Sequence, residues 1–267
     1  MATVFCFTST GNSLYAAKKI AGTIGGNVVP MNGEPVQCND DVIGFVFPVY
    51  FWGLPRMVSR FVANMRITNK DAYVFAVITC GGPVFGVLGL LKGLLKSKHN
   101  IRLRYGARII AGSNYLPEFE VNYTEALGRK VDQRIWSIAK AVKNREVNRV
   151  SPLSFHNRLI LKLYPGENSD QYFTTASTCT GCATCQRVCP SRNISLEAGK
   201  PRFQHKCEHC LACLHHCPAR AIDWKENTKG KERFRNPGVS LEELIAFHGR
   251  DKAYSPSCLP ISSIARS

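Results

Sequence analysis

The sequence predicts a doubly wound α/β domain with a parallel sheet, followed by a smaller cysteine-rich domain. The first half of the 267 residues alternates short apolar runs with segments of helical periodicity, an order typical of parallel α/β sheets. Two matching runs in the second half contain eight of the twelve cysteines. The expected divisions are a first domain at 1–149, a linker at 150–170, a cysteine-rich domain at 171–228, and a basic C-terminal extension with a short helix at 229–267.

The expected strands are nearly continuous apolar runs rich in β-branched and aromatic residues, as buried parallel strands are. They cover residues 3–7, 41–47, 72–79 and 108–111, with a weaker strand near 27–29. Helical periodicity covers the intervening segments 13–24, 55–65 and 84–98, and then 123–144. A sheet built in this way binds its ligand at the carboxyl ends of its strands.

A run of six small or polar residues follows the first expected strand and precedes its helix. Hydroxyls and backbone N–H groups meet there at a helix N-terminus, where the helix dipole favours an anion. An ordinary helix cap is the simpler interpretation, but a cap needs fewer such residues. The absence of G-x-x-x-x-G-K-[ST] and of G-x-G-x-x-G at this point argues against a nucleoside triphosphate or a dinucleotide. The residues are Thr8, Ser9, Thr10, Gly11, Asn12 and Ser13.

Two further loops at expected strand ends contain aromatic residues or glycines. Aromatic side chains stack on a planar ligand, and glycines let backbone amides approach its edge. At least one of the three aromatic residues is expected to be part of the core instead. The loops predict a planar aromatic ligand at this edge of the sheet. They consist of Tyr50, Phe51, Trp52 and Gly53 after one strand, and of Cys80, Gly81 and Gly82 after the next.

Each cysteine run has the spacing C-x2-C-x2-C-x3-C-P, which builds four-iron, four-sulfur sites. Three thiolates of one run bind one cluster, and the fourth cysteine binds the other cluster. Zinc is the competing interpretation, but it needs only four ligands per ion and gives no reason for two runs that both end in proline. The expected ligands are Cys179, Cys182, Cys185 and Cys217 for one [4Fe–4S] cluster, and Cys207, Cys210, Cys213 and Cys189 for the other.

The remaining cysteines and the histidines near the runs support weaker predictions. Because all eight cluster cysteines are present, the histidines are expected to be solvated or to support the ligands. The other cysteines are scattered, which indicates no disulfide framework and fits a reducing cytosol. The last dozen or so residues are expected to form a loose tail. The histidines are His205, His209, His215 and His216, and the scattered cysteines are Cys6, Cys38, Cys80 and Cys258, the last of them in the tail.

The net charge of +16 favours binding of anionic cofactors or acidic partners. Solvated helix faces around anionic cofactors are the simplest interpretation, and docking of an acidic redox partner protein is the sharper one. No nucleic-acid motif accompanies the charge, so nucleic acid is not an expected ligand. Neither a signal peptide nor a membrane span is expected, which predicts a cytoplasmic protein. The sequence leaves the oligomeric state open.

Thr8-Ser-Thr-Gly-Asn-Ser13 resembles the phosphate loop of flavodoxins, which reads T-x-T-G-N-[ST]. Phe51-Trp52-Gly53 and Cys80-Gly81-Gly82 resemble the loops on either side of their flavin. With the cysteine runs, residues 1 to about 240 are similar to the flavodoxin–ferredoxin fusion proteins of anaerobic bacteria and archaea. This resemblance implies FMN in a flavodoxin-like domain and two [4Fe–4S] clusters in a small α+β ferredoxin domain, with a hairpin turn at Ala198-Gly199.

A flavin exchanges one or two electrons and a cluster exchanges one, so the combination predicts an electron-transfer protein. The alternative is an FMN-dependent reductase of a small molecule, such as a quinone or an unsaturated or nitro compound, fed by its own clusters. No catalytic side chain is expected. Residues 49–54 and 79–86 contain no Asp or Glu, so the flavin reduction potential should be less negative than in an acidic flavodoxin.

Overall fold

The computed structural model of the chain describes residues 1–32, 35–84, 86–150, 164–249 and 258–261. Five parallel strands form its central sheet in the order β2-β1-β4-β6-β7. Numbered by their order in the chain, these strands run 2-1-3-4-5, the order of flavodoxin-like doubly wound sheets, so the predicted fold class is confirmed. The strands are β1 (Ala2–Cys6), β2 (Asn27–Pro30), β4 (Val42–Pro48), β6 (Tyr73–Cys80) and β7 (Leu103–Ile110).

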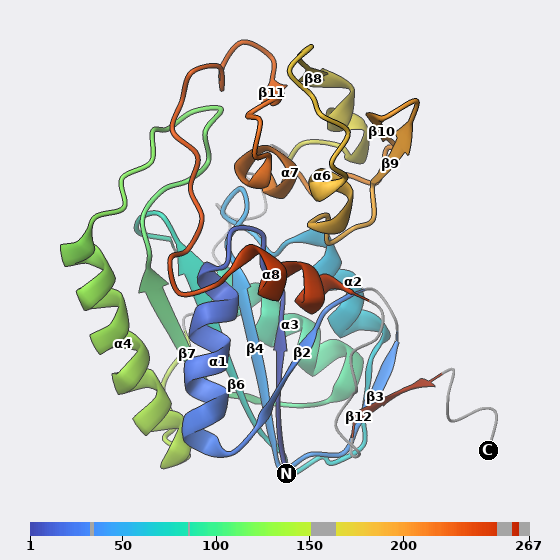
Figure 1. Cartoon of the computed structure of the whole chain (residues 1–267). Coiled ribbons are helices and arrows are strands. Elements are labelled where there is room, and N and C mark those ends of the chain that lie inside the picture. The colour runs from blue at the N-terminus through green and yellow to red at the C-terminus, as the bar shows by residue number, and fades with distance from the viewer. Residues whose placement is uncertain (33–34, 85, 151–163, 250–257, 262–267) are drawn as a thin grey trace.

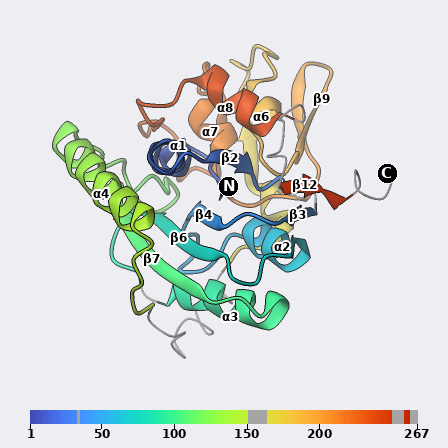
Figure 2. The same ribbon diagram turned by 90° about the horizontal axis from the view of Figure 1, so that it is seen from below.

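Helices cover both faces of the sheet, because successive side chains of each strand point to opposite sides (Figure 2). Phe5 and Phe45 pack with the residues of α2 and α3 on one face. Val4 and Phe75 pack with those of α1 and α4 on the other face. The helices are α1 (Asn12–Ile24), α2 (Arg56–Asn64), α3 (Val87–His99) and α4 (Glu125–Lys143).

The strand β7 begins at Leu103, whereas the sequence predicted a strand only from Arg108. Because β7 is an edge strand of the sheet, its side chains alternate between buried and more exposed positions. A search for continuous apolar runs therefore missed its first half, which includes Arg104 and Gly106. The strand end that matters for ligand binding was nevertheless correctly located.

Gly44 in β4 is required by the packing of the sheet. A Cβ atom at this position would lie 2.3 Å from the ring of Phe75. We expect Gly44→Ala to lower the free energy of unfolding by about 1–3 kcal/mol, because the core has no room for the methyl group. Denaturant unfolding measures this difference. Gly93→Ala in α3 is the control, since nothing lies within 4 Å of its added Cβ and helix propensity predicts a change of at most about 1 kcal/mol, toward higher stability. Equal stability of the two variants would contradict this packing.

The cysteine-rich part of the chain lies over the carboxyl ends of the sheet strands (Figure 1). It consists of two antiparallel strand pairs and short helices, as predicted for an α+β domain. Ala198 and Gly199 both have positive φ, 47° and 72°, and make the expected turn between β9 and β10. The elements are η2 (Glu167–Tyr172), β8 (Phe173–Thr175), α6 (Thr184–Arg187), β9 (Ile194–Glu197), β10 (Lys200–Phe203), α7 (Ala212–His216) and β11 (Ile222–Trp224).

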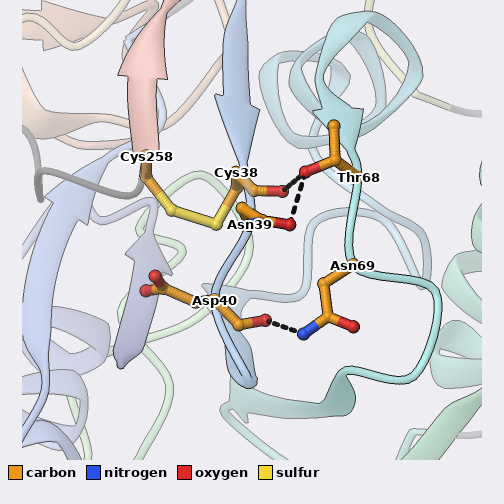
Figure 3. Close-up of a disulfide and its surroundings, with 6 residues drawn as sticks. All are labelled: Cys38, Asn39, Asp40, Thr68, Asn69 and Cys258. Carbon is orange, nitrogen blue, oxygen red and sulfur yellow. Dashed lines mark hydrogen bonds between the residues drawn. A yellow bond between two sulfur atoms is a disulfide. The ribbon is translucent and has the colours of Figure 1, made fainter.

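A second small sheet joins segments of the first domain to a segment near residue 260. Its strands are β3 (Val36–Cys38), β5 (Arg66–Ile67) and β12 (Cys258–Pro260). In the β3–β12 pair Cys258 lies directly opposite Cys38, and the two form a disulfide (Figure 3). Two expectations were therefore wrong: the scattered cysteines do include a disulfide, and Cys258 belongs to a strand. The cause is pairing across 220 residues, which no local spacing reveals.

The C-terminal extension docks on the first domain through helix α8 (Leu241–His248). Ser240 caps this helix, its Oγ accepting a hydrogen bond from the Glu243 N–H at 3.1 Å. Leu244 and Phe247 are buried in one apolar cluster with residues of α1 and α4. The extension thereby becomes part of the layer that covers the sheet.

Residues 234–239, which we call the strap, cross the loop that precedes α1. The Asn236 N–H donates to the carbonyl of Thr10 at 2.8 Å, and its amide donates to Asn12 Oδ1 at 2.7 Å. The strap therefore backs the predicted phosphate loop. Most of the predicted linker (151–163) and parts of the tail (250–257 and 262–267) lie outside the described residues. Among the helices that are described, none has the length and apolar character to cross a membrane.

Candidate functional site

A cavity of about 400 Å³ lies at the carboxyl ends of β1, β4, β6 and β7. This is the location that the predicted sheet requires and a volume typical of ligand sites. Every predicted residue of the three loops lines it except Gly11 and Gly53. The lining residues from that prediction are Thr8, Ser9, Thr10, Asn12, Ser13, Tyr50, Phe51, Trp52, Cys80, Gly81 and Gly82.

The polar loop before α1 has hydroxyl groups and backbone amides that are held in place by hydrogen bonds and could bind a phosphate group. The Thr8 hydroxyl accepts a hydrogen bond from the Gly11 N–H at 3.2 Å, and Ser13 Oγ lies 2.8 Å from Thr79 Oγ1. Tyr50 donates its hydroxyl to Ser9 Oγ at 3.0 Å. The first turn of α1 carries no acidic residue to repel an anion. Hydroxyls and amides at the positive end of a helix thus fit a phosphate.

Gly11 and Gly53 shape the loops without lining the cavity. Gly11 has φ +97°, and a Cβ there would lie 3.0 Å from the Asn236 Cβ of the strap. Glycine is therefore required both for the turn into α1 and for the approach of the strap. The Gly53 N–H donates to the carbonyl of Tyr50 at 2.8 Å and closes the aromatic loop.

The three aromatic residues have different surroundings. Tyr50 packs against the core, as expected for at least one of them, and burial raises the pKa of its hydroxyl well above the usual value. The Phe51 ring stands edge-on to the Tyr115 ring, with 5.2 Å between their centres. Trp52 is 45% exposed at the cavity. The loop therefore offers one anchored and one accessible ring to a planar ligand.

A fourth loop, after β7, also lines the cavity, and the sequence-based prediction missed it. The Asn114 amide donates to Thr10 Oγ1 at 2.8 Å, which ties this loop to the phosphate loop. Glu118 and Phe119 line the cavity too. The segment Gly112-Ser-Asn-Tyr115 follows a strand and combines small, polar and aromatic residues, a signal that could have identified it. The expectation about the flavin potential was drawn from two loops and omitted the carboxylate of Glu118.

Cys80 belongs to the wall of the cavity rather than to a reactive site. Burial raises the pKa of its thiol to about 11, so the thiol is protonated near neutral pH. Its Sγ donates to the carbonyl of Ile109 at 3.6 Å. The residue is therefore a weak nucleophile near neutral pH.

The first expected quartet of cysteines surrounds one small cavity, lined by Cys179, Cys182, Cys185 and Cys217. Cys182 is exposed, and its hydrogen bond with Thr184 lowers the pKa of its thiol. The Cys217 sulfur accepts the N–H of Ala221 at 3.2 Å. A fourth cysteine from the second run thus joins three from the first.

The second expected quartet is more deeply buried. Burial raises the pKa of the Cys213 thiol, and the neighbouring thiols of Cys210, Cys189 and Cys207 raise it further, ahead of Cys185 of the first quartet. Cys189 of the first run therefore lies near the cysteines of the second run. The Cys189 and Cys207 sulfurs accept backbone N–H groups at 3.3 and 3.2 Å. Two quartets of thiols that exchange their fourth member, with amides directed at the sulfurs, fit the thiolate ligands of [4Fe–4S] clusters.

The two sites meet at Cys210. This cysteine is a member of the second expected quartet, and it also lines the large cavity together with His209 and Leu211. Trp52 and Cys80 of the sheet domain line the same cavity. A ligand in the cavity would therefore lie next to whatever the second quartet binds.

Three of the four histidines, which were expected to be solvated or to support the ligands, are buried, so the first of these alternatives does not hold for them. His215 and His216 lie 2.9 and 3.1 Å from the carbonyls of Asn114 and Ser9. Burial lowers the pKa of both, to about 3 and about 4, which keeps them neutral near pH 7. His209 Nε2 likewise lies 3.0 Å from the Tyr115 hydroxyl, whereas the His205 side chain is 62% exposed.

Comparison with known proteins adds one family match. Residues 172–218 match the model of a 4Fe-4S dicluster domain. Among solved structures, the chain is similar to the two-electron reduced flavodoxin of Megasphaera elsdenii, with 16% identity over 44% of this chain and 92% of that one and a TM-score of 0.32. It is also similar to a flavodoxin from the domain Archaea, with 13% identity over 53% of this chain and 98% of that one and a TM-score of 0.33. A search of curated proteins gives no match.

Proposed function

We propose that this chain is an electron-transfer protein that carries FMN in the large cavity and a [4Fe–4S] cluster at each cysteine quartet. The position of Cys210 supports this proposal most directly, because one residue belongs both to the second quartet and to the cavity wall. The divisions at 149, 170 and 228 remain our proposal for the flavin domain, the linker, the cluster domain and the extension. FMN would exchange one or two electrons and each cluster one, which joins one-electron to two-electron chemistry.

The chain's own residues have separate tasks at the proposed flavin site. The loop 8–13 would bind the phosphate through hydroxyls and amides, and Asn114 holds Thr10 in place for it. Tyr50 is fixed by the core and by Ser9, so it would orient one side of the ring. The glycines at 81 and 82 would admit backbone amides to the ring edge.

The two quartets differ in exposure, and this difference suggests a direction for the path. Cys182 of the first quartet is exposed, whereas Cys210 of the second faces the cavity. An external redox protein would therefore exchange electrons at the first quartet, and the second would connect it to FMN. The net charge of +16 favours an acidic partner, because complementary charge speeds encounter.

A second candidate function is reduction of a small molecule at the flavin. The observation in its favour is that two aromatic side chains lining the cavity are accessible: Trp52 is 45% and Phe119 is 49% exposed. Such rings could stack on a quinone or a nitro compound. Rapid reoxidation of the reduced protein by a quinone, saturating with quinone concentration and slowed by Trp52→Ala, would favour this function over that of a carrier.

The experiment that tests the proposed function is anaerobic purification followed by cofactor analysis. We expect about one FMN and about eight iron and eight sulfide per chain, with absorption of flavin and clusters that both bleach on reduction with dithionite. Iron and sulfide without flavin would contradict the proposal for the cavity. Flavin with zinc in place of iron would contradict the proposal for the quartets.

A further inference from the structure

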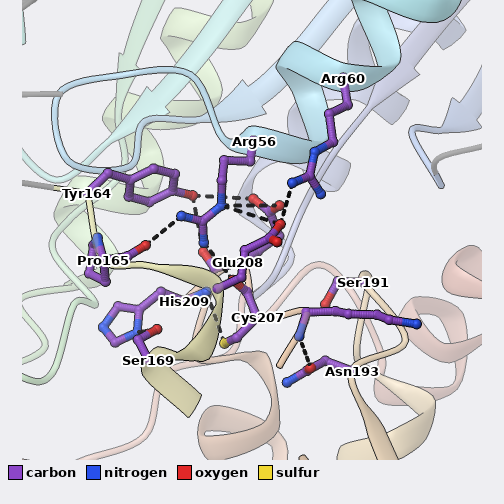
Figure 4. Close-up of polar contacts among 12 residues, drawn as sticks. Arg56, Arg60, Tyr164, Pro165, Ser169, Ser191, Asn193, Cys207, Glu208 and His209 are labelled. Atoms are coloured by element: carbon purple, nitrogen blue, oxygen red, sulfur yellow. Dashed lines mark hydrogen bonds and ion pairs between the residues drawn. The ribbon is translucent and has the colours of Figure 1, made fainter. Parts of the chain in front are cut away.

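Arg56 reaches from the sheet domain into the cysteine-rich domain. It is the first residue of α2, and its Nη2 donates to the carbonyl of Cys207 at 2.6 Å (Figure 4). Its Nη1 donates to the carbonyl of Pro165, and the guanidinium lies 4.3 Å from the centre of the Tyr164 ring. Its side chain is only 21% exposed. Arg56 is thus a largely buried cation held directly against a proposed cluster ligand.

Glu208 is the buried acid that faces this cation. Its side chain is 2% exposed, and its Oε1 lies 3.9 Å from Arg56 Nε. The Tyr164 hydroxyl donates to Oε2 at 3.3 Å, and the Met57 N–H also bonds to the carboxyl group. Burial raises the pKa of Glu208, whereas the Met57 amide and the charge of Arg56 oppose that change. The cation of Arg56 and the Tyr164 hydroxyl stabilise the carboxylate against the opposing effect of burial.

The two charges act in opposite directions on the second quartet. Glu208 lies in the chain between Cys207 and Cys210, so its carboxylate belongs to the loop that carries the second quartet. The Arg56 guanidinium donates to the Cys207 carbonyl at 2.6 Å, so its positive charge lies beside the same loop. An electron added at this quartet would be repelled by the carboxylate and attracted by the guanidinium.

We propose that Arg56 and Glu208 form a charge pair across the domain boundary that sets the reduction potential of the cluster at the second quartet. This inference rests on the proposed function, since it needs a cluster at that quartet. Because Arg56 belongs to the sheet domain and Glu208 to the cluster domain, the potential depends on the docking of the two. Separation of the domains would leave the carboxylate alone beside the cluster and make the potential more negative.

The charge pair makes signed predictions for the full-length protein, purified without oxygen and titrated electrochemically with EPR detection of the clusters. Arg56→Gln should shift one of the two cluster potentials to more negative values, because the positive charge beside Cys207 is lost while the Glu208 carboxylate remains. Glu208→Gln should shift the same potential to more positive values. The double variant should return near the wild-type value, and the other cluster should move little in all three.

Two kinds of variant separate the charge effect from a loss of structure. Arg56→Lys keeps the charge but not the planar guanidinium, so its cluster potential should stay near that of the wild type. Arg202→Gln and Glu197→Gln are the matched controls, since this pair in the same domain is 64% and 58% exposed with 3.1 Å between its charged atoms. Neither should shift a cluster potential, because solvent screens them.

The outcomes distinguish this inference from the proposed function. Eight irons in the wild type with shifts of the same sign in Arg56→Gln and Glu208→Gln would overturn the charge pair and leave the proposed function standing. Unchanged cluster potentials in both Arg56→Gln and Glu208→Gln would also overturn the charge pair and leave the proposed function standing. If Arg56→Gln loses iron, the other two variants still test the charge pair. The charge pair predicts a positive shift of the cluster potential in Glu208→Gln and no shift in Arg56→Lys, and any other result would overturn it. A wild type without clusters would overturn both.

Discussion

Replacing Cys217 with alanine should remove about half of the iron, and the cluster lost should be the one at the first cysteine run. Cys217 belongs to the second run, but it lines the small cavity with Cys179, Cys182 and Cys185. Alanine offers no ligand atom, so a four-thiolate site would lose one of its four bonds. Iron and sulfide analysis should therefore give about four of each per chain.

Labelling of free thiols identifies which cluster is lost. In Cys217→Ala the exposed Cys182 should react with iodoacetamide, because its hydrogen bond with Thr184 lowers the pKa of its thiol. In Cys189→Ala the lost cluster should be the other one, and Cys182 should stay protected by iron. Cys80→Ser, outside both runs, should keep all the iron. Protection of Cys182 in Cys217→Ala would contradict the exchange of the fourth cysteine between the runs.

Phe247→Ala should produce a large loss of stability. Phe247 is 1% exposed and packs in one apolar cluster with Leu14 and Ile20 of α1. Removing a buried phenylalanine ring costs about 3–5 kcal/mol, which lowers the melting temperature by roughly 6–20 °C for a protein of this size. Anaerobic calorimetry or circular dichroism on the cofactor-loaded protein measures the change.

An exposed residue of the same helix provides the control for this variant. Ala246 precedes Phe247 but lies on the exposed side of α8. Ala246→Ser should change the melting temperature by no more than about 2 °C, since surface substitutions alter stability by about 0.5 kcal/mol or less. Equal melting temperatures for the two variants would show that α8 contributes nothing to the fold, contrary to the burial of Phe247.

The sequence predicts those parts of the fold that depend on local pattern. Continuous apolar runs identify β1, β4 and β6, because buried parallel strands are apolar on both faces. The first half of β7 escapes this criterion since its side chains alternate. The small sheet of β3, β5 and β12 escapes it as well, because its strands have three residues or fewer and β12 pairs with β3 across most of the chain.

In the candidate site too, the predictable parts are those that are contiguous in the sequence. Residues of the loop 8–13 line the large cavity, and the two cysteine runs supply the two quartets. The contacts between domains are not contiguous: Arg56 and Cys207 are separated by 151 residues, and His216 and Ser9 by 207. An arginine in a helix and a histidine beside a cysteine are ordinary residues until the fold brings their partners near. Such pairs cannot be recognised from one sequence.

During synthesis, the phosphate loop leaves the ribosome long before the segment that backs it. Asn236 follows Asn12 by 224 residues, and it supplies hydrogen bonds to Thr10 and Asn12 from outside the loop. Domains generally fold in order as they emerge. A nascent chain that ends before the strap has its sheet but an unsupported cofactor loop. Tight retention of the proposed cofactor would therefore require the segment around Asn236 in addition to the first domain.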